Sequence, residues 1–144
     1  MDFIAIDFET ANQHYFSPCQ VGIAVVEDFQ ITHQISNYIY VNPDNFIGEE
    51  LVGDKLFGDI QYRKHKIKES MVKDAPEFDT IYNSILKDLI NKFPIIAHNS
   101  DFDIGVLRQT LESYNINLPQ QKFVCTQKIS NQIAQGKLFE RKKN

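Results

Sequence analysis

Apolar runs with the two-residue period of strands occupy the first third of the chain. Phe3–Glu9 is apolar on both faces until its acidic end, which is typical of a strand buried in the middle of a sheet. Val21–Glu27 is a second, β-branched run, and the short segment Asp28–Gln30 predicts a hairpin connection to a third strand, Ile31–Val41. The pattern therefore predicts three antiparallel strands at the start of the domain.

Helical periodicity begins at Pro76, after the less regular segment Asn42–Lys68, and ends at Pro94. The apolar stripe of this predicted helix consists of Phe78, Ile81, Tyr82, Ile85, Leu86 and Leu89. Ile95–Ala97 then has the pattern of a short buried strand, and Ser100 is the predicted N-cap of a further helix, with Asp103 completing a variant capping box. A helix between buried strands predicts a mixed sheet with crossover packing, which is an α/β fold.

The composition favours a single globular domain without a membrane segment. The chain has 144 residues, of which 42% are hydrophobic and 24% are charged. No run approaches the roughly 18 consecutive apolar residues that span a bilayer, and no signal-peptide pattern begins the chain. Cys19 and Cys125 lack metal-ligand spacing and are expected to be free thiols. We therefore expect a cytoplasmic protein.

The formal net charge of −4 argues against a protein that coats nucleic acid by bulk attraction. It remains compatible with a nuclease, because an acidic metal site can dominate the charge while basic residues gather elsewhere. Such a group of basic residues surrounds His65 in the sequence: Arg63, Lys64, Lys66 and Lys68. Such a run is more often solvated surface than a binding site, and it becomes a candidate phosphate contact if the fold places it beside the acids.

Two carboxylates, Asp7 and Glu9, stand at the end of the first predicted strand. Residues i and i+2 of a strand point to the same face, about 7 Å apart, so these two acids repel each other unless a positive charge lies between them. A divalent metal ion is the commonest source of that charge. Simple solvation of both acids in a polar loop is the alternative, and the strand by itself does not decide between the two.

Asp101 and Asp103 fall in the first turn of the helix that starts near Ser100, directly after a strand. Acids in a first turn are stabilised by the helix dipole, so an ordinary stabilising role is one interpretation. Strand ends and helix starts on one edge of a sheet also assemble functional sites. If Ile95–Ala97 neighbours the first strand, Asp103 can reach the two acids of that strand.

Several segments in order carry a family resemblance: IDFETAN, CQVGIAVV, VKDAPEF, IIAHNSDFDIGVLRQTLE and FVCTQKIS. From about Phe3 to Ser130 they resemble the DEDD (DEDDh-like) 3′→5′ exonucleases, in the branch with the epsilon proofreading subunit of DNA polymerase III and ribonuclease T. The resemblance implies an RNase H-like mixed sheet over residues 1–135, with three antiparallel strands, then parallel strands, flanked by helices. Residues 136–144 are expected to form a polar basic tail.

The resemblance implies that Asp7, Glu9 and Asp103 are catalytic metal ligands. Asp103 takes the family position because it follows Phe102 in a Phe-Asp pair, whereas Asp101 takes a variable one. Two divalent ions, Mg²⁺ or Mn²⁺, are expected to hold the scissile phosphate. One would activate the attacking water and the other would stabilise the leaving 3′ oxygen.

Thr10, Ala11 and Asn12 follow the first motif and are expected to line the pocket for the 3′-terminal nucleotides. Such pockets hold nucleotides by stacking and backbone contacts that tolerate many sequences. Further candidates for contact with substrate are His65, His98 and Phe102. Phe102 fits the core equally well, and the choice between DNA and RNA is not readable because it rests on contacts to the 2′ hydroxyl.

The third motif of the family has no counterpart in this sequence. It should supply a fourth acid and a His or Tyr general base, but no Asp or His follows Asp103, and the later acids are Glu112 and Glu140. We therefore expect a domain that is incomplete at its C-terminus, lacks the last helix and binds one metal ion rather than two. Because a general base contributes about 10²–10⁴-fold in rate, weak activity or none is expected.

Two alternatives to an active nuclease follow from the missing motif. One is a catalytically inactive nuclease-like domain that binds nucleic acid or protein, and the other is a structural fragment without an independent role. The expected partners are 3′ ends of single-stranded DNA or RNA, and DNA polymerase or repair proteins. An absent helix would also expose apolar surface, which makes a homodimer a further candidate.

Overall fold

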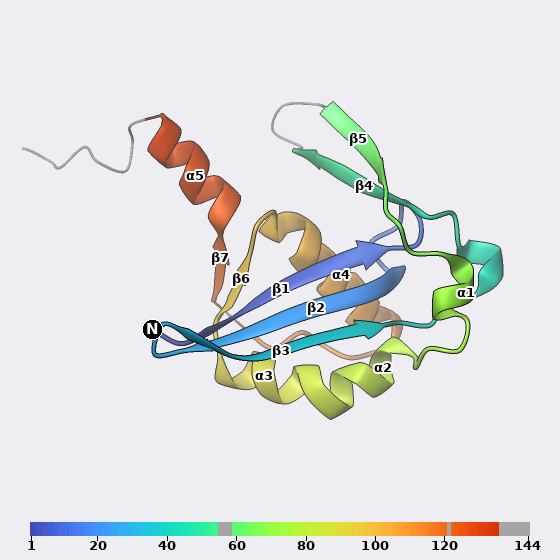
Figure 1. The fold of residues 1–144 in the computed structure, drawn as a ribbon, viewed down its shortest axis with the longest axis horizontal. Coiled ribbons are helices and arrows are strands. Elements are labelled where there is room, and N and C mark those ends of the chain that lie inside the picture. The colour runs from blue at the N-terminus through green and yellow to red at the C-terminus, as the bar shows by residue number, and fades with distance from the viewer. Residues whose placement is uncertain (55–58, 121, 136–144) are drawn as a thin grey trace, which may run out of the picture.

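The computed structural model describes residues 1–54, 59–120 and 122–135, with the backbone alone at 49–54 and 59–64. Its centre is a five-stranded sheet in the order β3-β2-β1-β6-β7 (Figure 1). Neighbouring pairs among the first three strands are antiparallel, whereas β1–β6 and β6–β7 are parallel. The strands are β1 (Phe3–Thr10), β2 (Pro18–Glu27), β3 (Gln30–Tyr38), β6 (Ile95–Ala97) and β7 (Phe123–Cys125). The predicted mixed α/β sheet is therefore confirmed.

The segment between Asn42 and Lys68, expected to be irregular, contains a second small sheet. β4 (Glu49–Asp54) and β5 (Asp59–Lys64) pair antiparallel, between a 3₁₀ turn at Pro43–Asn45 and α1 (Glu69–Val72). In Figure 1 the hairpin lies beside the C-terminal end of β1. The chain that leads into β4 is fastened there, because the backbone N–H groups at positions 47 and 48 both donate to the Ala11 carbonyl, at 2.8 and 2.9 Å.

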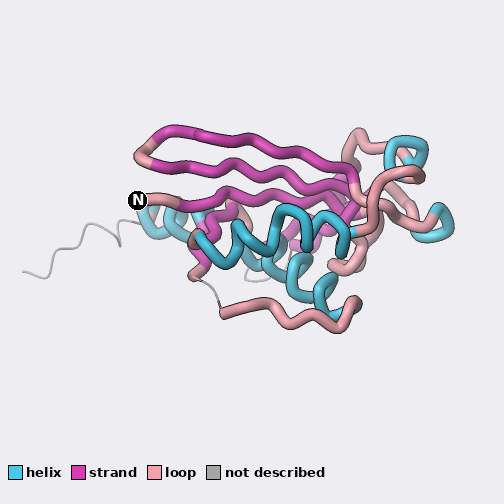
Figure 2. Tube along the Cα trace, turned by 90° about the horizontal axis from the view of Figure 1, so that it is seen from below, coloured by secondary structure: helices cyan, strands magenta, loops and turns pink. Residues whose placement is uncertain are grey.

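The main helices lie on one side of the sheet, as the view along the sheet in Figure 2 shows. They are α2 (Phe78–Ile81), a π-helical turn (Tyr82–Leu86), α3 (Lys87–Lys92) and α4 (Ser100–Ser113). β1 reflects this layering: Ile4, Ile6 and Phe8 are buried in the core, whereas Ala5 is half-buried and Asp7 is exposed. One face of β1 therefore builds the core and the other carries the acids.

The π-helical turn explains why the buried stripe differs from the predicted one. Predicted core positions Ile85 and Leu89 are half-buried, whereas Leu86 and Ile90 are fully buried. A π turn adds a residue to one turn of a helix, so it rotates the residues that follow it relative to the sheet. The apolar stripe continues through the turn, displaced by one position.

The last described helix, α5 (Thr126–Ala134), follows β7 and stands away from the sheet (Figure 1). None of its residues is buried, and Ile129 and Ile133 are 39% and 47% exposed. Within the described ranges, no helix has the length and apolar character needed to cross a membrane. The predicted tail, residues 136–144, lies outside the described residues.

Candidate active site

The candidate site forms where β1 outruns its parallel neighbour. The pairing of β1 with β6 ends at Ala5 opposite Ile96, although β1 continues to Thr10. Beyond that point the backbone N–H of Phe8 donates to the Asp103 carboxylate Oδ1, at 2.9 Å and in a buried position. A side chain from α4 thus satisfies a strand donor where β6 has ended, and this contact joins the two acidic segments.

The start of α4 differs from the predicted capping box. The N-cap is Asn99, not Ser100, and the cap has no side-chain hydrogen bond. Instead, the Asn99 carbonyl accepts from the backbone N–H groups of Phe102 and Asp103, at 2.9 and 3.3 Å. The Asp103 carboxylate turns to the buried Phe8 N–H because leaving that donor unsatisfied costs about 1–3 kcal/mol.

The three predicted acids differ in their exposure to solvent. Asp7 is exposed and Glu9 is half-buried, and both extend from the face of β1 opposite its buried residues. Asp103 is only 3% exposed. The candidate site thus combines one buried carboxylate with two that are more accessible to solvent.

The electrostatics of Asp103 reflect its burial and the two acids of β1. The pKa of Asp103 is raised to about 7, mainly by burial and in smaller part by the negative charges of Asp7 and Glu9, while the hydrogen bond from Phe8 lowers it. Groups with perturbed pKa values that lie in a cleft with charged partners mark candidate functional sites. The acids therefore form one electrostatic unit, as the spacing along the sequence suggests.

The donor chemistry of this unit fits a divalent cation. Carboxylate oxygens are the hard ligands that Mg²⁺ and Mn²⁺ prefer. Across the part of the chain that the structure describes, however, no three Asp, Glu, His or Cys side chains converge closely enough to form a ready three-ligand cage. The residues that would hold a cation are present, and their side chains would have to close around it.

Asp101 belongs to a different surface. Its carboxylate accepts from the Lys128 ammonium of α5 at 3.0 Å, and the two side chains are 72% and 54% exposed. Exposed pairs of this kind contribute about 0–1 kcal/mol. The two aspartates in the first turn of α4 thus lie in different environments, one exposed and one buried. Substitution of Asp101 is therefore a matched control for substitution of Asp103.

The three residues after the first motif are buried and organise the loop that follows β1. Thr10, Ala11 and Asn12 are 1%, 0% and 9% exposed. The Asn12 amide nitrogen donates to the Asn45 carbonyl at 2.9 Å, and its oxygen accepts from the His14 N–H at 2.8 Å. They hold the end of β1 against the segment before β4, and their contact with a nucleotide stays a prediction.

His65 anchors the loop between β5 and α1 to the end of β1. Its Nε2 lies 2.6 Å from the Thr10 carbonyl, and its Nδ1 accepts from the Ile67 N–H at 3.3 Å. These partners assign the ring proton to Nε2, since a carbonyl can only accept. Lys66 and Lys68 beside it are exposed, whereas the side chains of the basic residues before it lie outside the described residues. The phosphate contact of His65 stays a prediction.

The other two substrate candidates flank the start of α4. His98 is exposed at the end of β6, and its Nδ1 lies 3.0 Å from the Thr126 hydroxyl at the start of α5. Phe102 is half-buried and packs edge-on against Tyr15, with ring centroids 5.6 Å apart and an interplanar angle of 88°. His98 is thus accessible at the edge that carries the acids, and Phe102 contributes to packing.

Two residues that hold the start of α4 in place, Tyr15 and Gly105, were not among the site residues predicted from the sequence. A Cβ added at Gly105 would lie 2.7 Å from Cδ2 of the Tyr15 ring, so this ring rests directly on the backbone of α4. The contact fixes the β1–β2 loop to the helix half a turn after Asp103. A glycine inside an otherwise regular helix is the signal that could have indicated such a close approach.

A mixed sheet in this strand order, with helices packed on it, has the RNase H-like fold. The model of the RNase T exonuclease family matches residues 4–143. The chain belongs to this exonuclease family.

Individual relatives agree with this membership. The chain is 28% identical over 144 residues to DNA polymerase III subunit epsilon of Haemophilus influenzae, covering 93% of the chain and 52% of that relative. It is 27% identical over 143 residues to 3′-5′ exonuclease DinG of Bacillus subtilis, covering 93% of the chain and 13% of the relative. The chain thus spans about half of the first relative's length and a small share of the second's.

Solved structures show the same fold. The zinc-bound form of Escherichia coli exonuclease I in complex with single-stranded DNA superposes with a TM-score of 0.68. The superposition covers 92% of this chain and 29% of that one, at 13% sequence identity. At this identity the likeness establishes the fold of the chain.

Proposed function

We propose that this chain forms a metal-dependent exonuclease domain that hydrolyses phosphodiester bonds at the 3′ ends of DNA or RNA. The observation that carries the proposal is the buried Asp103 carboxylate, which accepts from the Phe8 N–H between Asp7 and Glu9 in the sequence and is affected by their negative charges. Membership of an exonuclease family and a relative named as a 3′-5′ exonuclease support the reaction and its direction.

Asp7, Glu9 and Asp103 are the residues that would hold Mg²⁺ or Mn²⁺. Bound divalent ions neutralise phosphate charge and activate water for attack. The chain itself positions the ligands: the Phe8 N–H fixes one oxygen of Asp103, and burial excludes bulk water from this carboxylate. Asp7 and Glu9, which are more accessible, are placed to meet a phosphate that approaches from the open face of the sheet.

The rate of this chain should be low for a nuclease. No Asp or His follows Asp103, so the later part of the sequence supplies neither a fourth aspartate nor a histidine base. A positioned general base contributes about 10²–10⁴-fold, and its lack slows hydrolysis accordingly. We therefore propose slow, metal-dependent removal of 3′-terminal nucleotides.

The test is a time course on a 5′-labelled single-stranded oligonucleotide with a free 3′ end, with Mn²⁺ or with chelator. Slow shortening from the 3′ end that needs metal and is lost in Asp7→Ala supports the proposal, with Asp101→Ala as the matched control. Equal shortening by Asp7→Ala would overturn the assignment of the acids. Brisk digestion that depends on Asp7 would overturn the predicted low rate.

The second candidate function is a nuclease-like domain that binds without cutting. The observation that favours it is the lack of any Asp or His after Asp103. Metal-dependent oligonucleotide binding without turnover over a day would support this candidate, with fluorescence anisotropy as the measurement. If the chain shows no binding and no turnover, the result counts against both candidate functions.

The proposed macromolecular partners follow from the same site and family. They are single-stranded DNA or RNA 3′ ends and, since one relative is a subunit of DNA polymerase III, a DNA polymerase or repair protein. A homodimer is a further proposal, because Ile129 and Ile133 are exposed on α5. Sedimentation at several protein concentrations distinguishes a dimer from a monomer.

A further inference from the structure

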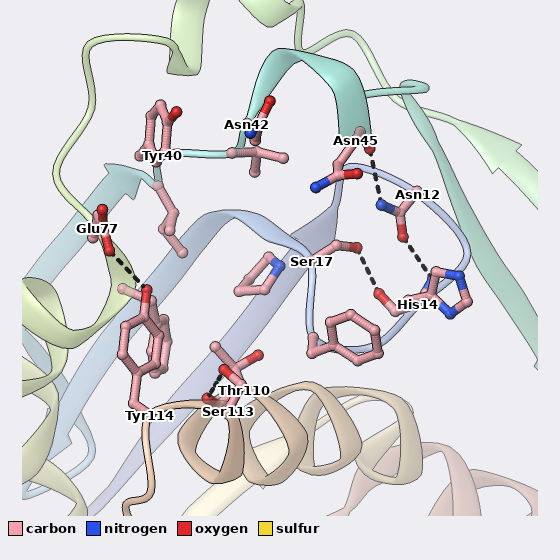
Figure 3. Close-up of a pocket in the computed structure, with 15 residues that line it drawn as sticks. Asn12, His14, Ser17, Tyr40, Asn42, Asn45, Glu77, Thr110, Ser113 and Tyr114 are labelled. Atoms are coloured by element: carbon pink, nitrogen blue, oxygen red, sulfur yellow. Dashed lines mark hydrogen bonds between the residues drawn. The ribbon is translucent and has the colours of Figure 1, made fainter.

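A cavity of about 460 Å³ lies at the C-terminal end of α4, away from Asp103 at its start (Figure 3). Its walls come from the C-terminal half of α4, the start of α2, the β1–β2 loop and the segment after β3. Thr110, which lines it, follows Asp103 by seven residues, or about 10 Å along the helix axis. None of the three proposed metal ligands lines this cavity.

The feature that marks this cavity as a binding site is the Thr110 hydroxyl. Thr110 is 3% exposed, and its Oγ1 has no hydrogen-bond partner within the described residues. Figure 3 shows the side chain rising from α4 toward the cavity. The neighbouring Ser113 hydroxyl donates to the Thr110 carbonyl at 2.6 Å and leaves Oγ1 unsatisfied. A buried hydroxyl without a partner costs about 1–3 kcal/mol, which a ligand can recover.

Aromatic rings form one wall of the cavity. Phe78 and Tyr114 stack with ring centroids 6.4 Å apart and an interplanar angle of 28°. The Tyr114 hydroxyl donates to Glu77 Oε2 at 3.2 Å, which fixes this ring. Tyr40 adds a third ring to the lining. Phe78 is buried behind this wall, whereas the half-buried Tyr114 and Tyr40 offer flat apolar surface suited to a planar ligand.

Amide groups face the rings from the other side of the cavity. Asn42 and Asn45 line it and carry both donors and acceptors, as does Asn12, whose side chain ties the β1–β2 loop to Asn45. Among the described lining residues are one carboxylate, Glu77, and no lysine or arginine. The charge therefore disfavours a phosphate and favours a neutral ligand.

We propose that this cavity binds a neutral nucleoside or free nucleobase, which places its planar ring against the aromatic wall and hydrogen-bonds to the Thr110 hydroxyl. The volume lies within the roughly 300–1,000 Å³ of small-molecule sites. A nucleobase offers the combination that the lining requires: a flat π-face, edge donors and acceptors, and no charge. The site is separate from the proposed metal ligands and does not depend on them.

The test is a titration of the whole chain with adenosine and with thymidine, without added metal, followed by calorimetry and by NMR shifts of the residues that line the cavity. At least one nucleoside should bind saturably. Thr110→Val should weaken this binding about tenfold or more, which corresponds to one lost hydrogen bond. Thr110→Ser keeps the hydroxyl and should bind within about twofold of the parent. Thr80→Val, at an exposed threonine of α2, is the control and should leave binding unchanged.

Two further readouts separate this cavity from the acidic site and from misfolding. Without ligand, Thr110→Val should melt at or above the temperature of the parent, because it removes a buried, unpartnered hydroxyl. The nucleoside 5′-monophosphate should bind this cavity more weakly than the nucleoside. No saturable binding at about 10 mM, equal binding by Thr110→Val, or loss of binding in Asp7→Asn would each overturn the proposal.

Discussion

The backbone N–H of Phe8, in the central strand, donates to the carboxylate of Asp103, in the first turn of α4, at 2.9 Å. Ninety-five positions separate the two residues in the sequence. The contact closes the gap left where β6 ends, and it holds a buried acid beside Asp7 and Glu9. Every prediction about the acidic site depends on this arrangement.

The stability of the metal-free chain should fall as the pH rises from about 4 to about 7. The pKa of Asp103 is raised from 3.8 to about 7 in the folded state, so the folded chain binds more protons than the unfolded chain in this window. By linkage, the free energy of unfolding then decreases with rising pH and levels off above the folded pKa. Urea unfolding at several pH values measures this slope.

Asp103→Asn should flatten that slope, because an amide does not titrate while its oxygen still accepts from Phe8. Asp101→Asn, at the exposed neighbour, should leave the slope unchanged. An unchanged slope in Asp103→Asn would show that another group is responsible. Added Mn²⁺ should stabilise the parent more at pH 8 than at pH 5, because the ion competes with protons for the acids.

Gly105→Ala should destabilise the chain by about 1–3 kcal/mol, although alanine is the better helix former. The added Cβ would lie 2.7 Å from the Tyr15 ring, which must move. Gly22→Ala is the control, since its Cβ meets the Asp7 carbonyl oxygen at an ordinary 3.9 Å. Chemical denaturation measures both changes, and equal effects at the two glycines would contradict the proposed contact.

The same contact predicts coupling between Gly105 and Tyr15. In a Tyr15→Leu background the clash is relieved, so Gly105→Ala should cost less than in the parent. A double-mutant cycle gives this coupling energy directly. Strict additivity of the two changes would mean that the ring does not limit the space at Gly105.

His65→Ala should lower stability by about 1–2 kcal/mol through loss of the hydrogen bond to the Thr10 carbonyl and of ring packing. His33→Ala, at an exposed position of β3, should change stability by less than about 0.5 kcal/mol. If His65→Ala instead reduces oligonucleotide binding at unchanged stability, the phosphate contact is its main role.

The first three strands could be predicted because their signals are local. The two-residue alternation and the Asp28–Gln30 connection place the hairpin of β2 and β3, and the register confirms it with Glu27 opposite Gln30. The two turn residues Asp28 and Phe29 have positive φ angles of 51° and 63°, as tight hairpins require. Such features depend on neighbouring residues and are visible in the sequence.

Features that depend on tertiary contacts could not be predicted in the same way. The capping box expected for Ser100 and Asp103 does not form, because the Asp103 carboxylate accepts from the Phe8 N–H, which β6 is too short to satisfy. Ile85 and Leu86 were both expected in the buried stripe, but with the π turn Ile85 is only half-buried, and no local residue pattern marks this turn. The Thr110 cavity is formed by four separate segments, so its lining emerges only in the fold.

The measurement that tests the central claim most directly is Mn²⁺ binding by calorimetry to the parent and to Asp7→Asn, Asp103→Asn and Asp101→Asn at pH 8. If Asp7, Glu9 and Asp103 hold one cation together, the parent binds Mn²⁺, each change at a ligand weakens binding about tenfold or more, and Asp101→Asn binds like the parent. Equal Mn²⁺ affinity in all four proteins, or none in the parent, would contradict the account.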